Sequence, residues 1–443
     1  MNPLARLMAA RGCAVQGSDR DFDRGRNERV AELLREAGVE LLPQDGSAIT
    51  AGLARVVHSA AVEPTVPEMV AAREHGIECV ARPQLLAEVL NAGSPGVAIA
   101  GTSGKSTVTG MVAWILRQTG RAATVLGGAA LAEQGANHMG CFAAAGDDAP
   151  VVAEACESDG TLVGYRPGIG VILNMSRDHH ELDALAQQFG TFAANSAQLV
   201  VNADCPHAQA LAAEHAQVIR FGRAETNDLQ LDIVRPGPEH GQASLVTADE
   251  QALLELPQPG EHNLENAAAA CAVALALAVP LRESVAALAS FPGVARRFQQ
   301  LGITESGIRV VDDYAHNGAK IAAAVAAAQL GCDRLIAVFQ PHGFGPARFL
   351  RDELRAGIPQ WLRPADRWAY LPIYDAGGTT DRSISSEDLA ADLPPDLRAV
   401  ACADHAAALT WIAENATPGS TVLIMGARDP RLGDFAATVF DLL

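Results

Sequence analysis

The segment that most constrains this chain is an apolar run that leads through a glycine-bounded loop into a helix-forming stretch, Val97-Ala-Ile-Ala-Gly-Thr-Ser-Gly-Lys-Ser-Thr107. Glycines let backbone N–H groups point into one concavity, and the start of the following helix adds partial positive charge. Lys105 can reach phosphate oxygens, and Ser106 or Thr107 can offer a hydroxyl to Mg²⁺. Ile99 stands where the common phosphate loop has a glycine, so this is a variant loop. The segment predicts nucleotide binding; the alternative is an ordinary strand, turn and helix with a chance lysine.

The charge of the chain excludes some partners. Its 443 residues carry a net charge of −19 at pH 7, which argues against nucleic acid or an anionic membrane, because both need a basic face. An acidic protein that binds phosphates needs backbone N–H groups, a few cations and a metal ion. Lys105 and Lys320 are the only lysines in the sequence, so lysine-specific chemistry has two possible positions. We expect Lys105 to be an exposed loop residue that contributes little to stability.

Hydropathy and cysteine spacing predict a cytoplasmic protein without a membrane span. No uninterrupted apolar run reaches 18 residues, and the richest stretch, 266–280, is typical of a buried helix. The first eleven residues lack the apolar centre of a signal peptide. No two of the eight cysteines are closer than 15 residues, so zinc-ligand spacing is absent from the sequence and reduced thiols are expected.

Short apolar runs alternate with longer amphipathic or alanine-rich segments, which predicts an α/β protein with parallel sheets covered on both faces. Loop-forming residues at 91–96 and 291–293 divide the chain into predicted domains 1–95, 96–293 and 294–443. The expected helices include Pro3–Ala10, Thr107–Gln118, Asn263–Ala278 and Ile321–Leu330. The expected strands are Arg55–His58, Val97–Ala100, Val151–Ala155, Gly170–Leu173, Leu199–Asn202, Val310–Asp313, Leu335–Phe339, Trp368–Pro372 and Thr421–Met425.

Further motifs follow the loop in a fixed order. They are Glu154-Ala-Cys-Glu-Ser-Asp159, Asn174-Met-Ser-Arg-Asp-His179, Gly260-Glu-His-Asn-Leu-Glu-Asn266, Phe291-Pro-Gly-Val-Ala-Arg-Arg-Phe298, Asp312-Asp-Tyr-Ala-His316, Phe339-Gln-Pro-His342 and Met425-Gly-Ala427. Together with the loop they resemble the motifs of the Mur ligases over essentially the whole chain. These enzymes use ATP to activate a carboxylate as an acyl phosphate and couple it to an amine.

The resemblance implies three domains: a Rossmann-like N-terminal domain for a UDP-linked substrate, a central ATPase-like domain, and a Rossmann-like C-terminal domain for the amine. It is strongest to the branch that adds L-alanine to UDP-N-acetylmuramate. A branch that adds a whole murein peptide, a ligase with another acceptor, and a non-catalytic nucleotide-binding regulator remain alternatives. ATP and Mg²⁺ are the implied cofactors, and the sequence leaves the oligomeric state open.

The resemblance also assigns residues. Catalytic roles fall on Lys105, Glu154, His179 and Arg297. ATP would contact Gly101, Thr102, Ser103, Gly104, Lys105, Ser106, Thr107, Asn263, Asn266, Arg297 and Asp313. The metal would be held by Ser106, Glu154 and His179, with Glu157 as a further candidate, and substrates would contact Ser18, Asp19, His316, His342 and Arg348. Several assignments have a structural alternative: acidic residues in a first helical turn for the glutamate pair, a surface loop for Asp178-His179, a helix cap at Asn263, and surface salt bridges at Arg297 and Asp313.

Three departures from the family pattern bear on these expectations. The chain begins at the helix that follows the family's first strand and glycine-rich turn, so we expect those elements upstream of Met1; the alternative is their loss. Arg348 is the one arginine retained in the loop after His342, which is arginine-rich in alanine-adding relatives. Asn317-Gly318 replaces a residue followed by proline, which loosens a loop beside His316.

Overall fold

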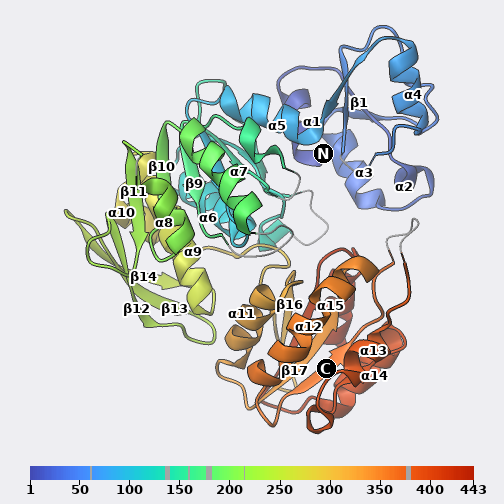
Figure 1. Ribbon diagram of the computed structural model, residues 1–443, viewed down its shortest axis with the longest axis vertical. Coiled ribbons are helices and arrows are strands. Elements are labelled where there is room, and N and C mark those ends of the chain that lie inside the picture. Colours follow the sequence, from blue (N-terminus) through green and yellow to red (C-terminus); the bar gives the residue numbers. More distant parts are fainter. Residues whose placement is uncertain (60–61, 135–139, 158–159, 176–181, 214, 376–380) are drawn as a thin grey trace. The chain divides into compact units, whose positions relative to one another are not determined.

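The computed structural model describes the chain except residues 60–61, 135–139, 158–159, 176–181, 214 and 376–380 (Figure 1). It divides into two compact units. The first comprises Met1–Asp232, Ser244–Leu253 and Asn266–Phe291, and the second comprises Ile233–Ala243, Leu254–Glu265 and Pro292–Leu443. The first 95 residues thus belong to the first unit, and the boundary expected after residue 95 stays a prediction.

Residues 1–95 form two small parallel sheets with helices between the strands. The elements are α1 (Asn2–Ala10), β1 (Val15–Gly17), α2 (Arg20–Asp23), α3 (Glu28–Glu36), β2 (Val39–Leu41), β3 (Arg55–His58), α4 (Pro67–Glu74), β4 (Glu78–Ala81) and α5 (Arg82–Asn91). β1 pairs with β2, and β3 pairs with β4. The expected helix at Pro3–Ala10 is confirmed as α1, which buries Leu4 and Leu7 on one face.

A ten-stranded sheet has the order β14-β13-β12-β11-β10-β9-β5-β8-β6-β7, and most of it belongs to the first unit; parts of β12, β13 and β14 and the first five residues of α9 are counted in the second. Its strands are β5 (Gly96–Ala100), β6 (Thr124–Leu126), β7 (Phe142–Ala143), β8 (Val151–Glu154), β9 (Ile169–Ile172), β10 (Gln198–Asn202), β11 (Val218–Gly222), β12 (Leu229–Arg235), β13 (Gly241–Val246) and β14 (Gln251–Leu256). Its helices are α6 (Lys105–Gln118), α7 (Leu182–Asn195), α8 (Pro206–Ala212), α9 (Glu261–Ala276) and α10 (Leu281–Leu288). β5 is buried along its whole length and pairs in parallel with β8 and β9, which explains its continuous apolar sequence.

The second unit contains a six-stranded sheet with the order β15-β16-β20-β17-β18-β19. Its strands are β15 (Gln299–Ile303), β16 (Arg309–Asp313), β17 (Arg334–Gln340), β18 (Arg367–Tyr370), β19 (Val400–Ala401) and β20 (Ser420–Gly426), and its helices are α11 (Gly318–Gln329), α12 (Phe344–Trp361), α13 (Ser386–Ala391), α14 (His405–Asn415) and α15 (Leu432–Leu442). Alternate residues of β17 join two apolar clusters. One cluster includes α11, α12 and α13 and the other includes α14 and α15, so both sheet faces are covered.

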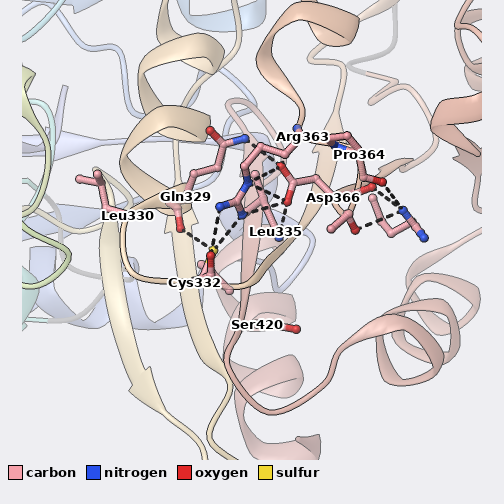
Figure 2. Close-up of polar contacts among 12 residues, drawn as sticks. Gln329, Leu330, Cys332, Leu335, Arg363, Pro364, Asp366 and Ser420 are labelled. Carbon is pink, nitrogen blue, oxygen red and sulfur yellow. Dashed lines mark hydrogen bonds and ion pairs between the residues drawn. The ribbon is translucent and has the colours of Figure 1, made fainter.

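The amino ends of β17 and β18 are held by a buried carboxylate (Figure 2). Asp366 accepts hydrogen bonds from Leu335 N at 2.8 Å, Gln329 Nε2 at 2.8 Å and the Arg363 guanidinium at 3.0 Å. Burial opposes ionisation of Asp366, but these hydrogen bonds outweigh it and lower the pKa of the carboxyl. Cys332 Sγ lies 3.4 Å from Arg363 Nη2 in the same cluster. The cluster fixes the sheet at the amino edge.

All nine expected strands are present, with ends shifted by two residues or fewer. The three expected helices beyond α1 are confirmed as α6, α9 and α11. Four consecutive strands, β11 to β14, were not predicted. Buried and more exposed residues alternate along β13, so a search for continuous apolar runs misses such strands. Among the described residues, no helix is long and apolar enough to cross a membrane.

One histidine, His262, makes the stability of the second unit depend on pH, although its side chain keeps some exposure to solvent. Burial lowers the pKa of His262 from 6.5 to about 4, and its ring packs edge-on against Phe298. The unfolded chain therefore takes up a proton first as the pH falls. The free energy of unfolding keeps its full value above pH ~6.5 and falls as the pH drops toward ~4. At pH 5 the loss is about 2 kcal/mol. We expect the His262→Gln variant to have a flatter profile of thermal midpoint against pH.

Tryptophan fluorescence is a suitable readout for this prediction, because three of the four tryptophans lie in the second unit. The exposed His207→Gln variant is the matched control and keeps the slope of the unaltered protein. Equal slopes for all three proteins would contradict the prediction.

Candidate active site

The glycine-bounded loop joins the carboxyl end of β5 to the first turn of α6. Gly101 has φ +150°, and a Cβ there would lie 2.9 Å from Leu173 Cβ, which is closer than packed side chains approach. Gly104 caps α6 with φ +83°, a left-handed conformation that favours glycine. The two glycines therefore let the loop turn tightly against the end of β9 and present its N–H groups beside the helix start.

Asn174, just after β9, clamps this loop. Its Oδ1 accepts hydrogen bonds from Thr102 Oγ1 and from Ser103 N, each at 2.8 Å, and its Nδ2 donates to Ser103 O at 3.2 Å. Its backbone carbonyl accepts from Thr102 N at 3.2 Å. Sequence reasoning included Asn174 in a motif but gave it no role. The structure makes it the residue that fixes the shape of the loop.

Lys105, the first residue of α6, is paired with a buried carboxylate. Its Nζ lies 2.8 Å from Glu157 Oε2 and also contacts Gly101 O. The Lys105 side chain is 15% exposed and that of Glu157 is 4% exposed. The expectation of an exposed loop lysine was therefore wrong, because Lys105 begins α6 and is mostly buried. Its removal would leave a buried carboxylate without its cation, which argues against the small effect on stability that the sequence predicted. Glu157 meets the lysine, and its candidacy as a metal ligand stays a prediction.

Ser106 and Glu154 bring two hard oxygen groups together beside the loop. Ser106 Oγ donates to Glu154 Oε2 at 3.0 Å, and Gly128 N donates to Glu154 Oε1 at 2.6 Å. Glu154 ends β8, next to β5 in the sheet. A hydroxyl and a carboxylate next to a phosphate-binding loop suit Mg²⁺. The described residues contain no group of three His, Cys, Asp or Glu side chains able to hold a metal, and His179, the other expected ligand, lies outside them.

The two asparagines of the first turns of α9 have different surroundings. Asn266 Oδ1 lies 2.5 Å from the position that a Cβ on Gly104 would occupy, so its side chain packs directly on the phosphate loop. Asn263 Nδ2 instead donates to Pro259 O at 2.8 Å. Because α9 begins at Glu261, Asn263 is not a helix cap as the structural alternative supposed. Asn266 thus lies beside the loop, and the contacts of Asn263 and Asn266 with ATP both stay predictions.

In the second unit, Arg297 packs over the ring of Tyr314, and Asp313 directly precedes that tyrosine. The Arg297 guanidinium lies 4.4 Å from the centre of the Tyr314 ring. Asp313 accepts hydrogen bonds from Phe298 N at 2.5 Å and Ala315 N at 2.6 Å. Burial raises the pKa of Asp313, although Arg297 and these N–H groups oppose the shift. Their contacts with ATP stay predictions.

The neighbouring Arg296 has a structural role. Its Nε lies 3.2 Å from Asp312 Oδ2, and its Nη2 donates to Gly426 O at 2.8 Å. Burial raises the pKa of Asp312 to about 6, and the Arg296 guanidinium opposes that shift. Arg296 thus ties the ends of β16 and β20 together.

Of the expected amine-binding residues, the two histidines contact each other, whereas Arg348 contacts Asp381. The centres of the His316 and His342 rings lie 5.0 Å apart, and the rings meet edge to face. Arg348 Nη1 donates to Asp381 O at 2.7 Å and lies 3.4 Å from the Asp381 carboxylate. Lys320 Nζ lies 3.3 Å from His316 Nε2. The sequence analysis named Lys320 as one of two lysines but gave it no place beside His316.

Ser18 and Asp19 follow β1 in the first unit. Asp19 is the N-cap of α2, where Oδ1 accepts from Asp21 N at 2.8 Å. The described contacts of Asp19 are local and do not include the phosphate loop. The contact of Ser18 and Asp19 with a UDP-linked substrate stays a prediction.

Comparisons with known proteins agree with this architecture. Residues 1–93 match a model described as Mur ligase family, catalytic domain. Residues 99–274 match the Mur ligase middle domain, and residues 296–428 match the Mur ligase, glutamate ligase domain. The chain belongs to the Mur ligase family, and the resemblance inferred from its motifs is confirmed.

Particular relatives are similar over nearly their whole length. The UDP-N-acetylmuramate–L-alanine ligase of Acidothermus cellulolyticus is 35% identical, over 96% of this chain and 89% of the relative. The solved UDP-N-acetylmuramate-alanine ligase of Thermotoga maritima has a TM-score of 0.79 at 23% identity, covering 100% of this chain and 96% of that one. A murein peptide ligase from Psychrobacter arcticus has a TM-score of 0.68 at 22% identity, with the same coverage. The two structures show the three-domain α/β fold.

Binding of ATP is expected to depend on the side chain of Asn174. Asn174→Ala removes three side-chain hydrogen bonds that hold the loop, each contributing about 1 kcal/mol. We expect the KM for ATP to rise about tenfold to a hundredfold. Asn415→Ala, which removes one local bond in α14, is the control and leaves that KM unchanged. An unaltered KM in the Asn174→Ala enzyme would show that the loop holds its shape without the clamp.

Proposed function

We propose that this protein is an ATP-dependent ligase that joins L-alanine to the carboxylate of UDP-N-acetylmuramate through an acyl phosphate. The observation that carries the proposal is the arrangement of Lys105, Ser106 and Glu154 at one end of a clamped phosphate loop. The choice of substrates is supported by the name of the relative that matches 96% of the chain at 35% identity.

The first half of the reaction is assigned mainly to residues of the first unit, with Asn263 from the second. The N–H groups of the loop bind the ATP phosphates, and Asn174 keeps them in place. Lys105 neutralises charge on the phosphoryl group as it moves to the acceptor carboxylate. We assign Ser106 and Glu154, with His179, to Mg²⁺, which when bound offsets phosphate charge. Asn263 and Asn266 are assigned to the ATP nucleoside, and Ser18 and Asp19 to the UDP end of the acceptor.

The second half is assigned to residues of the second unit. Arg297 would neutralise γ-phosphate charge, and Asp313 would orient the ribose. His316 and His342 would border the amine, which attacks the acyl phosphate and displaces inorganic phosphate. Packing against Tyr314 limits the rotamers of Arg297, so its guanidinium is held in place before the substrate binds.

A larger amine is the second candidate. Nothing lies within 4 Å of the position of a Cβ on Gly345, and Gly343 is equally small, so side-chain volume beside His342 is low. That room favours a peptide over a single amino acid, as in a murein peptide ligase. A non-catalytic regulator is less well supported, because Lys105, Glu154, Asn266 and Arg297 are all retained.

Phosphate release tests the phosphoryl step. Lys105→Ala should lower amine-dependent phosphate release at least about a hundredfold, the loss typical of a removed transition-state donor. The exposed Arg282→Ala is the control. Lys105→Ala also leaves Glu157 buried without a cation, so the Lys105→Ala, Glu157→Gln double variant checks that a loss of activity is not a loss of fold. Near-normal turnover in either variant would refute the role of the lysine.

An amine panel tests the second half. Phosphate release is measured with ATP, Mg²⁺, UDP-N-acetylmuramate and, in turn, L-alanine, glycine, L-serine and a murein tripeptide. We expect the highest kcat/KM with L-alanine. Turnover with the tripeptide alone would favour the peptide ligase. No turnover with any amine would favour the regulator.

A further inference from the structure

The turn that carries Arg297 has an uncommon backbone conformation. The residues on either side of it, Arg296 and Phe298, have φ angles of +57° and +48°, in the left-handed region that residues other than glycine rarely adopt. Arg297 N donates to Val294 O at 3.1 Å, which closes the turn. Such a conformation costs free energy and persists only where other contacts hold it. The contacts of Arg296 and Phe298 therefore determine how the backbone presents Arg297.

Phe298 holds the carboxyl-terminal side of the turn. Its side chain is 1% exposed and belongs to the apolar cluster that contains Val311 and Phe339. Its N–H donates to Asp313 Oδ2 at 2.5 Å. A buried ring and a hydrogen bond to a carboxylate thus fix Phe298, and neither contact involves the side chain of Arg297.

Arg296 holds the other side of the turn through its guanidinium and its backbone. Nε lies 3.2 Å from Asp312 Oδ2, and Nη2 donates to Gly426 O at 2.8 Å. Arg296 N donates to Gln299 Oε1 at 3.0 Å, and Arg296 O accepts from Tyr314 N at 2.8 Å. The Arg296 side chain is 12% exposed and that of Asp312 is 2% exposed. Water therefore screens this ion pair little.

The two aspartates that end β16 hold different neighbours of Arg297. Successive side chains of a strand point to opposite faces of its sheet. Asp312 accordingly meets the Arg296 guanidinium, whereas Asp313 accepts from Phe298 N. Both aspartates are set in place by the parallel pairing of β16 with β20. The end of one strand thus anchors the residues before and after Arg297.

Resting on the proposed function, we propose that the buried ion pair of Arg296 with Asp312 positions Arg297 for the phosphoryl step. Arg297 would neutralise γ-phosphate charge, and its guanidinium packs over the Tyr314 ring at 4.4 Å. Arg296 holds the backbone from which that guanidinium extends. A displacement of about 1 Å in a group that acts on the transition state can cost about a hundredfold in rate. Arg296 and Asp312 are therefore positioning residues, and neither is assigned a contact with ATP.

A pair that only stabilised the second unit would behave differently. A positioning residue acts through Arg297, so once the Arg297 side chain is removed, loss of the ion pair costs no further activity. Loss of stability alone would lower the activity by the same factor with and without Arg297, because independent effects add in free energy. The non-additivity of Arg296 with Arg297 is therefore the decisive measurement.

Amine-dependent phosphate release by the full chain tests the proposal, with ATP, Mg²⁺, UDP-N-acetylmuramate and L-alanine. We expect Arg297→Ala to lower kcat at least about a hundredfold. Arg296→Gln and Asp312→Asn should each lower kcat about tenfold to a hundredfold, with unchanged KM values for UDP-N-acetylmuramate and L-alanine. Added to Arg297→Ala, either substitution should lower kcat by less than about twofold.

Further variants separate positioning from loss of fold. Arg296→Gln leaves Asp312 buried without its cation, so the neutral variant, Arg296→Gln with Asp312→Asn, removes both charges. It should keep a thermal midpoint nearer that of the unaltered protein and still have the lowered kcat. Arg296→Lys keeps a cation beside Asp312 and should recover part of kcat. Arg351→Gln, which breaks an exposed ion pair with Asp392, is the matched control with unaltered kinetics.

The outcomes separate this inference from the proposed function. An equal loss of kcat from Arg296→Gln with and without the Arg297 side chain, or an unaltered kcat in the neutral variant, overturns this inference alone. An unaltered kcat in Arg297→Ala overturns the phosphate role of Arg297 and this inference with it. No turnover of L-alanine by the unaltered protein overturns the proposed function and this inference together.

Discussion

The parallel pairing of β5 with β8 and β9 is the constraint on which the candidate nucleotide site depends. Its register places Ile99 opposite both Glu154 and Val171, and Ala100 opposite Ile172. Glu154 is thereby set beside the loop that starts after Ala100, and Asn174 follows two residues after β9. Because side chains alternate along a strand, a shift of one residue would turn Glu154 to the other face of the sheet. The loop, its clamp and the carboxylate thus depend on one set of strand pairings.

Sequence reasoning succeeded where a function depends on consecutive residues. The strand, loop and helix at 97–107 could be predicted because the glycines, Lys105 and the apolar run are adjacent in the chain. The buried strands of both sheets could be predicted for the same reason. The order of motifs also fixed the family, which the comparisons then confirmed.

It failed where a partner comes from a distant segment. Glu157 lies 52 residues from Lys105, and only the sheet brings them together. The Asp381 partner of Arg348 is 33 residues away, so nothing local indicates that this arginine is occupied. Pairings of this length follow from topology, which local periodicity does not contain.

The two lysines of this acidic chain show how context decides what a cation does. Lys105 faces a buried carboxylate, so in the absence of ligand its charge is balanced, and a nucleotide phosphate must compete with Glu157 for it. Lys320 Nζ instead lies 3.3 Å from the His316 imidazole. The first arrangement keeps a cation stable at a site that carries several other phosphate-binding groups. The strand pairings of β5 with β8 and β9 therefore constrain Glu154 and the loop that carries Lys105, so a change at this site would disturb several groups together.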